Sequence, residues 1–166
     1  MKFIPRRRND SKVEELKHVH LFDNLPRRQL EFIAGNLDEV TVPAGETLIR
    51  EGHHNDAFWV LLDGQAEMQV AGIRSRKLAA GSFFGATSML DGRPAVATVL
   101  TKTPIRAMVA SAEQFRALEG NETIALRLMS YALERLREDI EAQQEAAKKP
   151  AAKPPAKAPA KAKAKK

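Results

Sequence analysis

Residues 42–64 read VPAGETLIREGHHNDAFWVLLDG, and this stretch decides the fold. It holds two short runs rich in branched and aromatic residues, Thr47–Arg50 and Phe58–Leu62. Such runs, bounded by glycine and polar residues, are typical of short β-strands. Asp63-Gly64 follows the second run and predicts a hairpin turn, because that turn needs positive φ. The stretch therefore predicts strands joined by tight turns.

The same pattern continues on both sides, over residues 38–109. Seven of the nine glycines lie between Gly45 and Gly92, and Ala71-Gly72 fits another turn. Short strands with glycine-rich turns indicate a sandwich or small barrel. The further strand-like runs are Asp38–Val42, Glu67–Val70, Ile73–Leu78, Val96–Leu100 and Ile105–Val109.

Helical patterns flank the strands. Residues 11–35 carry apolar side chains at helical spacing, with Asn24 as the predicted cap of a second helix and Gly35 at its end. Residues 112–147 are helical again, with Asn121 as a cap, whereas residues 1–10 are basic and irregular. The predicted fold class is mainly β with flanking helices.

The last predicted helix carries a regular apolar stripe, which we call the seam: Leu126, Met129, Leu133, Leu136 and Ile140. Its spacing of 3, 4, 3 and 4 residues is that of the a and d positions of a coiled coil. Two interpretations remain open at this point. The seam packs on the protein's own strands, or it pairs with a partner helix. The second interpretation is favoured by the polar residues around the seam, Glu134, Arg135, Arg137, Glu138 and Asp139.

Positive charge is concentrated at the end of the chain. Residues 148–166 hold eight lysines and no acid, which leaves 19 basic and 21 acidic residues before them. The segment has no aromatic or branched apolar residue, so it predicts a disordered tail. Its composition is similar to linker-histone tails, which implies non-specific nucleic-acid binding; an acidic protein surface or a solubilising role are the alternatives. The tail lysines are Lys148, Lys149, Lys153, Lys157, Lys161, Lys163, Lys165 and Lys166.

Several classes of protein are not expected from this sequence. It contains no cysteine, and its longest apolar run, Ala57–Leu62, has six residues, where a membrane helix needs about twenty. His53-His54-Asn55-Asp56 has no further ligand cluster in the sequence, so no metal site is predicted. Catalytic constellations are not evident either. We expect a soluble, cytoplasmic, non-enzymatic protein, with nucleoid association if the tail binds DNA.

Five stretches resemble the cyclic-nucleotide-binding domain of the catabolite activator and Crp–Fnr families. They are His20–Pro26, Val42–Gly52, Phe58–Gly64, Gly81–Gly85 and Ala97–Val99. The resemblance covers about residues 18–140 and implies a jelly-roll-like β-roll followed by a long dimerisation helix. It divides the chain into a basic segment (1–10), the roll with its first helices (11–120), the long helix (121–147) and the tail (148–166).

The resemblance also implies where a cyclic nucleotide would bind. In the family a glutamate after the cassette glycine holds the ribose, and an arginine pairs with the cyclic phosphate. Here Ala86 and Ala95 occupy those positions, and Val96 replaces a serine or threonine. Losing the charged contact costs about 1.5–3 kcal/mol. The corresponding pocket residues are Phe84, Gly85, Ala86, Thr87, Ser88, Arg93, Ala95, Val96, Ala97 and Thr98.

Three polar residues nearby could compensate. Arg93 is a cation close to the phosphate position, although Pro94 separates it from that position. Thr87 and Ser88 either offer hydroxyls to a ligand or cap the following helix, and capping is the favoured interpretation.

Two functions follow from these observations. The first is a regulatory or scaffolding module that forms a homodimer, has degenerate ligand anchors and no cofactor, and holds nucleic acid through its tail. Crp–Fnr regulators carry a helix-turn-helix after the long helix, where this chain has the tail, so base readout is not expected. The alternative is a functional cAMP or cGMP sensor that signals through a partner protein.

Overall fold

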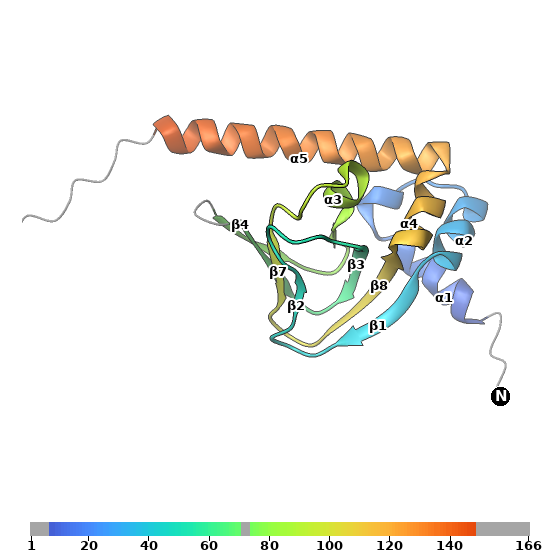
Figure 1. Cartoon of the computed structure of the whole chain (residues 1–166). Helices are drawn as coiled ribbons and strands as arrows, with labels where there is room; N and C mark the ends of the chain where they lie inside the picture. The colour runs from blue at the N-terminus through green and yellow to red at the C-terminus, as the bar shows by residue number, and fades with distance from the viewer. Residues whose placement is uncertain (1–6, 71–73, 149–166) are drawn as a thin grey trace, which may run out of the picture. The chain divides into compact units, whose positions relative to one another are not determined.

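The computed structural model describes residues 7–70 and 74–148, and within them two four-stranded sheets form a β-roll (Figure 1). One sheet has the order β1-β8-β3-β6 and the other β2-β7-β4-β5. All the ladders between these strands are antiparallel. The strands are β1 (Asp38–Val42), β2 (Thr47–Ile49), β3 (Ala57–Asp63), β4 (Ala66–Val70), β5 (Arg74–Leu78), β6 (Phe83–Phe84), β7 (Thr98–Thr101) and β8 (Ile105–Ser111).

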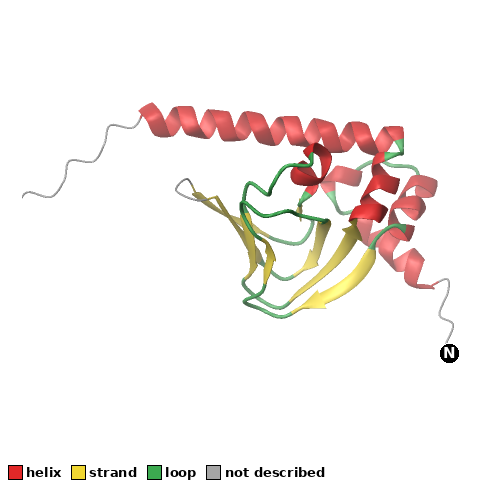
Figure 2. Cartoon of the chain, viewed as in Figure 1, coloured by secondary structure: helices red, strands yellow, loops and turns green. Residues whose placement is uncertain are grey.

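Helices precede, interrupt and follow the strands (Figure 2). Helices α1 and α2 pack on each other, α4 contacts β3 and β8, and α3 contacts β3. In the described part of the chain, no helix is long and apolar enough to cross a membrane. The helices are α1 (Arg7–Leu16), the 3₁₀ turn η1 (His20–Phe22), α2 (Arg27–Gly35), α3 (Ala86–Asp91), α4 (Ala112–Glu119) and α5 (Glu122–Lys148).

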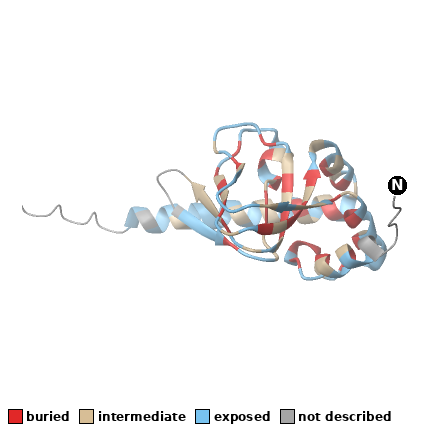
Figure 3. Cartoon of the chain, turned by 90° about the horizontal axis from the view of Figure 1, so that it is seen from below, coloured by how far each residue is buried: buried red, intermediate tan, exposed pale blue. Residues whose placement is uncertain are grey.

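The chain divides into two units, residues 1–133 and 134–166, and α5 runs across the boundary. The first unit contains the roll and two hydrophobic clusters. Alternation along β3 separates them, because neighbouring side chains of a strand point to opposite faces. Phe58 and Val60 belong to a helix-side cluster with residues of α1, α2, α4 and the start of α5. Leu61 belongs to an inner cluster between the sheets, against which Trp59 packs. Figure 3 shows these buried residues in the strands and adjoining helices.

The predicted fold class and most of the predicted strands are confirmed. Asp38–Val42 is a strand with the predicted bounds, whereas the run predicted from Val96 becomes a strand only at Thr98. The Ala71-Gly72 turn lies outside the described residues, although Val70 and Arg74, on either side of it, pair across β4 and β5. The two-residue strand β6 was not predicted, because two residues cannot display a period.

The prediction of a hairpin at Asp63-Gly64 is wrong. Strands β3 and β4 lie in different sheets, so this turn carries the chain from one sheet to the other. The glycine is nevertheless required: Gly64 has φ +86°, and a Cβ there would lie 2.4 Å from the carbonyl oxygen of Pro104. The local turn chemistry was identified correctly, but the pairing partner was not.

Three predictions about helix boundaries also need correction. Asn24 does not cap α2; it adopts φ 59° itself, and Pro26 occupies the cap position. Residues 7–10 are helical rather than irregular, because α1 begins at Arg7. Lys148 belongs to α5 rather than to the tail. The Asn121 cap is present, since its Oδ1 accepts a hydrogen bond from the Ile124 N–H at 3.3 Å.

Candidate functional site

The site begins at β6, the edge strand that pairs with β3. Phe83 packs in the helix-side cluster, and Phe84 packs in the inner cluster with its ring stacked on Trp59 at 6.1 Å. Gly85 then turns the chain into α3 with φ +92°. A Cβ at Gly85 would lie 2.4 Å from the carbonyl oxygen of Ala57, so only glycine fits this approach. Residues 85–95, which comprise this glycine, α3 and the first part of the connection to β7, are called the cassette.

The two expected anchor positions are buried and apolar. Ala86 and Ala95 expose only 4% and 6% of their surfaces, and neither side chain carries a polar atom. Ala97 is buried as well, whereas Val96 exposes 65% and is turned to solvent. Thr98 has a hydroxyl, but it accepts the backbone N–H of Glu51 at 3.1 Å. Ala86, Ala95 and Val96 therefore carry neither a charge nor a hydroxyl group.

The three polar residues proposed as substitutes have other surroundings. Arg93 and Thr87 are exposed, and the backbone N–H of Arg93 donates to Asp91 Oδ1 at 2.9 Å. No side chain caps α3, whose N-cap is Gly85, so the capping interpretation of Thr87 and Ser88 is wrong. Ser88 is 92% buried and faces Asn55 instead.

Asn55 is the polar residue of the site that the sequence did not reveal. It exposes 7% of its surface. Its Nδ2 donates to the carbonyl oxygens of Ala57 at 3.0 Å and Gly85 at 3.1 Å, and to Ser88 Oγ at 3.1 Å. Its Oδ1 accepts the Ala57 N–H at 3.3 Å. One side chain thus links the β2–β3 connection to the start of the cassette, 30 residues further along the chain.

The end of the cassette is tied to the same connection. The Gly52 N–H donates to the Ala95 carbonyl oxygen at 2.7 Å, and the Ala95 N–H donates to the His53 carbonyl oxygen at 2.9 Å. Residues 52–57 therefore contact the cassette at both its ends. The sequence could not show this, because each contact joins residues more than 25 positions apart.

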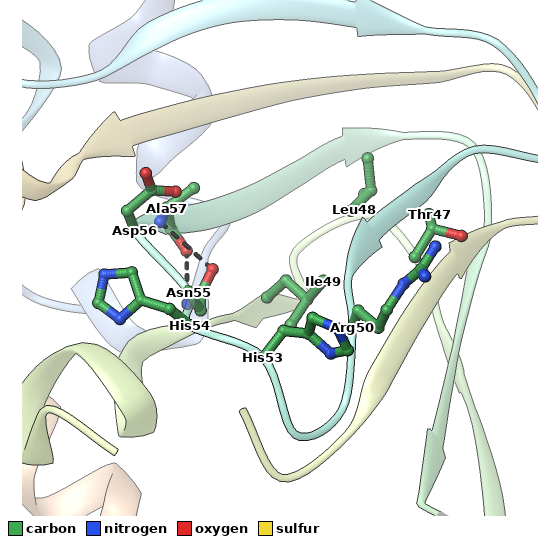
Figure 4. Close-up of a pocket in the computed structure, with 9 residues that line it drawn as sticks. All are labelled: Thr47, Leu48, Ile49, Arg50, His53, His54, Asn55, Asp56 and Ala57. Carbon is green, nitrogen blue, oxygen red and sulfur yellow. Dashed lines mark hydrogen bonds between the residues drawn. The ribbon is translucent and has the colours of Figure 1, made fainter. Parts of the chain in front are cut away.

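A cavity of about 290 Å³ lies along the β2–β3 connection (Figure 4). Its lining combines exposed charged and imidazole side chains with apolar ones. Figure 4 also shows the hydrogen bond from Asn55 to Ala57 among these residues. None of the predicted cassette residues is among those that line it. The lining residues are Thr47, Leu48, Ile49, Arg50, His53, His54, Asn55, Asp56 and Ala57.

The strongest electrostatic perturbations lie away from the cassette. Hydrogen bonds from Lys102, Ser75 and Gln69 lower the pKa of Glu67 to about 2. Arg106 bonds to Glu15 at 2.8 Å and to Glu39 at 3.1 Å, and these carboxylates raise its pKa. Both groups join neighbouring elements of the fold, so we interpret them as structural.

The helix α5 has two different apolar faces. Ile124 and Leu128 expose 1% of their surfaces each and pack in the helix-side cluster, and the Tyr131 ring lies 4.1 Å from the Phe83 ring. The seam lies on the opposite side, because a helix turns 100° per residue. All five seam residues are exposed, from 45% at Ile140 to 62% at Leu133. For Leu126, Met129 and Leu133, which lie in the first unit, the prediction of packing on the protein's own roll is therefore wrong.

Comparison with known proteins identifies the class to which this fold and site belong. The model of the cyclic nucleotide-binding domain family matches residues 39–121, which is half of the chain. The chain therefore belongs to the cyclic nucleotide-binding domain family, as the sequence resemblance implied.

Individual relatives and solved structures show which members of the family the chain is similar to. The chain is 32% identical over 119 residues to a cAMP-dependent protein kinase regulatory subunit of Emericella nidulans, covering 70% of this chain and 29% of that protein. The fold is shared with a solved structure of cAMP-bound PfPKA-R, with a TM-score of 0.72 and 19% identity over 85% of this chain and 48% of the other. It is shared as well with the regulatory domain of Toxoplasma gondii PKA in complex with cAMP, with a TM-score of 0.68 and 22% identity over 77% of this chain and 51% of the other. The chain thus spans less than a third of the curated regulatory subunit.

Proposed function

We propose that the protein is a non-enzymatic regulatory or scaffolding module whose cyclic-nucleotide fold is kept while its ligand anchors are lost. The observation that carries this proposal is the pair Ala86 and Ala95, which are buried, apolar and at the two anchor positions. Ala95 packs in the inner cluster with Phe84 and Ile49, whereas Ala86 packs in the helix-side cluster. Binding of cAMP or cGMP by this site should accordingly be weak or absent.

Restoring the anchors tests this proposal. The double variant Ala86→Glu/Ala95→Arg should bind fluorescent cAMP at least about tenfold more tightly than the wild type, because a charge-assisted phosphate contact is worth about 1.5–3 kcal/mol. Thr87→Glu is the matched control, since it adds the same carboxylate at an exposed neighbour. A melting curve of each variant establishes that it folds. Equal binding by the wild type and the folded double variant would count against the lost-anchor interpretation.

We further propose that the module forms a homodimer through the seam of α5. Among the described residues, the five seam side chains are exposed, whereas Ile124 and Leu128 on the other face of α5 pack in the helix-side cluster. A second copy offers an identical stripe, and a two-fold axis brings like patches together. The 3-4 spacing is what two supercoiled helices need for interlocking side chains.

The tail is proposed to hold nucleic acid without sequence preference. Lys148 ends α5, and the other tail lysines lie outside the described residues. Support comes from the charge: eight lysines without an acid can neutralise phosphates, and counterion release drives such binding. Two tails on one dimer would add avidity on a polymer. In a bacterial cell, such binding would place the protein on the nucleoid.

A salt titration tests the tail. Full-length protein and a form truncated after Glu145 are titrated against labelled duplex DNA by anisotropy at several salt concentrations. Log affinity of the full-length protein should fall with log salt at a slope of roughly −4 to −7, for about five to eight neutralised phosphates. The truncated form should not bind. Equal binding by both forms would place the nucleic-acid site on the folded body.

The second candidate function is a genuine cyclic-nucleotide sensor that signals through a partner protein. The regulatory subunit and the cAMP-bound structures among the relatives favour it. So does Arg76, which stands opposite Met68 in the β4–β5 ladder and therefore shares the face that packs on the inner cluster. In this alternative the wild type binds cAMP or cGMP tightly, and Arg76→Gln weakens that binding.

A further inference from the structure

The contacts of Asn55 assign it a role that the family's ligand chemistry does not cover. We infer that Asn55 and Ser88 are positioning residues that lock the cassette onto the β2–β3 connection, so that the cassette is docked without any nucleotide. This inference deepens the proposed function and rests on it in one respect: a module without anchors needs another means to hold its cassette.

The first observation is the burial and saturation of the Asn55 side chain. Asn55 exposes 7% of its surface, and its two amide hydrogens are shared among three oxygens that lie within 3.1 Å of Nδ2. Two of these oxygens belong to the cassette, at Gly85 and Ser88. A buried amide needs such partners, because a buried N–H group without an acceptor costs the full free energy of its desolvation. Moving the cassette away would remove two of the three acceptors of Asn55 Nδ2, the Gly85 carbonyl oxygen and Ser88 Oγ.

The second observation is the close backbone approach at the same point. The Cα of Gly85 lies so near Ala57 that an added Cβ would be 2.4 Å from its carbonyl oxygen and 3.2 Å from Asn55 Nδ2. Ser88 Oγ also lies 3.4 Å from the Gly85 carbonyl oxygen. The start of the cassette is thus packed against the connection as well as hydrogen-bonded to it.

The third observation is that both ends of the cassette use one support. Ala95 exchanges two backbone hydrogen bonds with Gly52 and His53, and Asn55 holds the other end. The alanines at the former anchor positions contribute apolar burial to the same closed arrangement. Hydrogen bonds at both ends favour the docked conformation of the cassette, so a ligand has less of a population shift to drive.

Hydrogen exchange of the full chain tests the lock. Amides of residues 85–95 should be protected in the absence of nucleotide, and 1 mM cAMP should change their exchange by less than about twofold. Asn55→Asp keeps the oxygen that accepts from Ala57 but removes both amide hydrogens, so exchange in this segment should rise about tenfold or more. Ser88→Ala should raise it by a smaller factor. His54→Asp, which adds the same charge at the exposed neighbouring residue, should leave it within about twofold.

The outcomes separate the lock from the proposed function. The lock is overturned if the amides of residues 85–95 in Asn55→Asp exchange within twofold of the wild-type rate. It is also overturned if exchange in β3 rises by the same factor as in residues 85–95, because Asn55 would then be a general stabilising residue. If Asn55→Asp does not fold, Ser88→Ala decides by the same two criteria. The lock is also contradicted if residues 85–95 of the wild type exchange freely without cAMP and become strongly protected when cAMP is added. Tight cAMP binding with no change in this segment contradicts the proposed function alone.

Discussion

Replacing Leu133 by aspartate should separate the proposed dimer into monomers. Leu133 is the central residue of the seam and exposes 62% of its surface in the single chain. It lies on the side of α5 away from Ile124 and Leu128, which are anchored in the helix-side cluster. The substitution therefore removes apolar surface from the interface without touching the core of the roll.

The size of the effect follows from the exposed fraction. Full burial of a leucine side chain stabilises by about 1.5–3 kcal/mol, so burying the exposed 62% contributes about 1–2 kcal/mol. A two-fold interface contains Leu133 twice, which doubles this to about 2–4 kcal/mol. The dissociation constant should then rise by roughly 30-fold to 1000-fold. Two facing carboxylates add repulsion to the lost burial.

Analytical ultracentrifugation at tens of micromolar measures the result. Wild-type protein should sediment as a dimer and Leu133→Asp as a monomer, with the melting temperature of the roll nearly unchanged. Ala142→Asp is the matched control, because it adds the same charge to the same helix on the side opposite the seam, and it should remain dimeric. A monomeric wild type, or a Leu133→Asp variant that stays fully dimeric, would refute the reasoning.

Three further predictions concern stability. The lowered pKa of Glu67 means that its ion pair with Lys102 stabilises the fold above the ordinary carboxyl value of 4.5 and is lost as the pH falls toward about 2; Glu67→Gln should flatten the fall of melting temperature in that window. Gly64→Ala should lower the free energy of unfolding in urea by more than the roughly 1–2 kcal/mol that a left-handed alanine costs, whereas Gly45→Ala, with positive φ but open space, should stay in that range. Truncation after Glu145 should leave the melting temperature of the roll within about 1 °C of the full-length value, because residues 146–166 have no aromatic or branched apolar side chain that could add to a core.

Local chemistry explains what the sequence predicted well. The strand-like composition of Asp38–Val42 and the capping position of Asn121 depend on neighbouring residues alone, and both the strand and the cap appear in the structure as expected. The resemblance in Val42–Gly52 and Gly81–Gly85 led to the right family, because close approaches such as that at Gly85 tolerate only one residue type.

Long-range geometry explains what the sequence did not predict. Asp63-Gly64 has the same turn chemistry whether the following strand pairs with the preceding strand or crosses to the other sheet. The local sequence therefore could not distinguish a hairpin from a crossing between sheets, and the hairpin prediction was wrong. Asn55 looked like one member of a polar turn, since its partners at Gly85 and Ser88 come 30 or more residues later. The seam was found by its spacing, but its exposure required knowing that Ile124 and Leu128 take the core face.

Isothermal titration calorimetry of the unmodified full-length protein with cAMP and cGMP tests the central claim most directly. Since Ala86 and Ala95 leave the ribose and phosphate without their charged partners, the heats should show no saturable binding at ligand concentrations up to hundreds of micromolar. The experiment needs a positive control, for which the Ala86→Glu/Ala95→Arg variant serves if it gains affinity as proposed. Saturable binding of either nucleotide to the wild type with a submicromolar dissociation constant would contradict the account and establish the sensor instead.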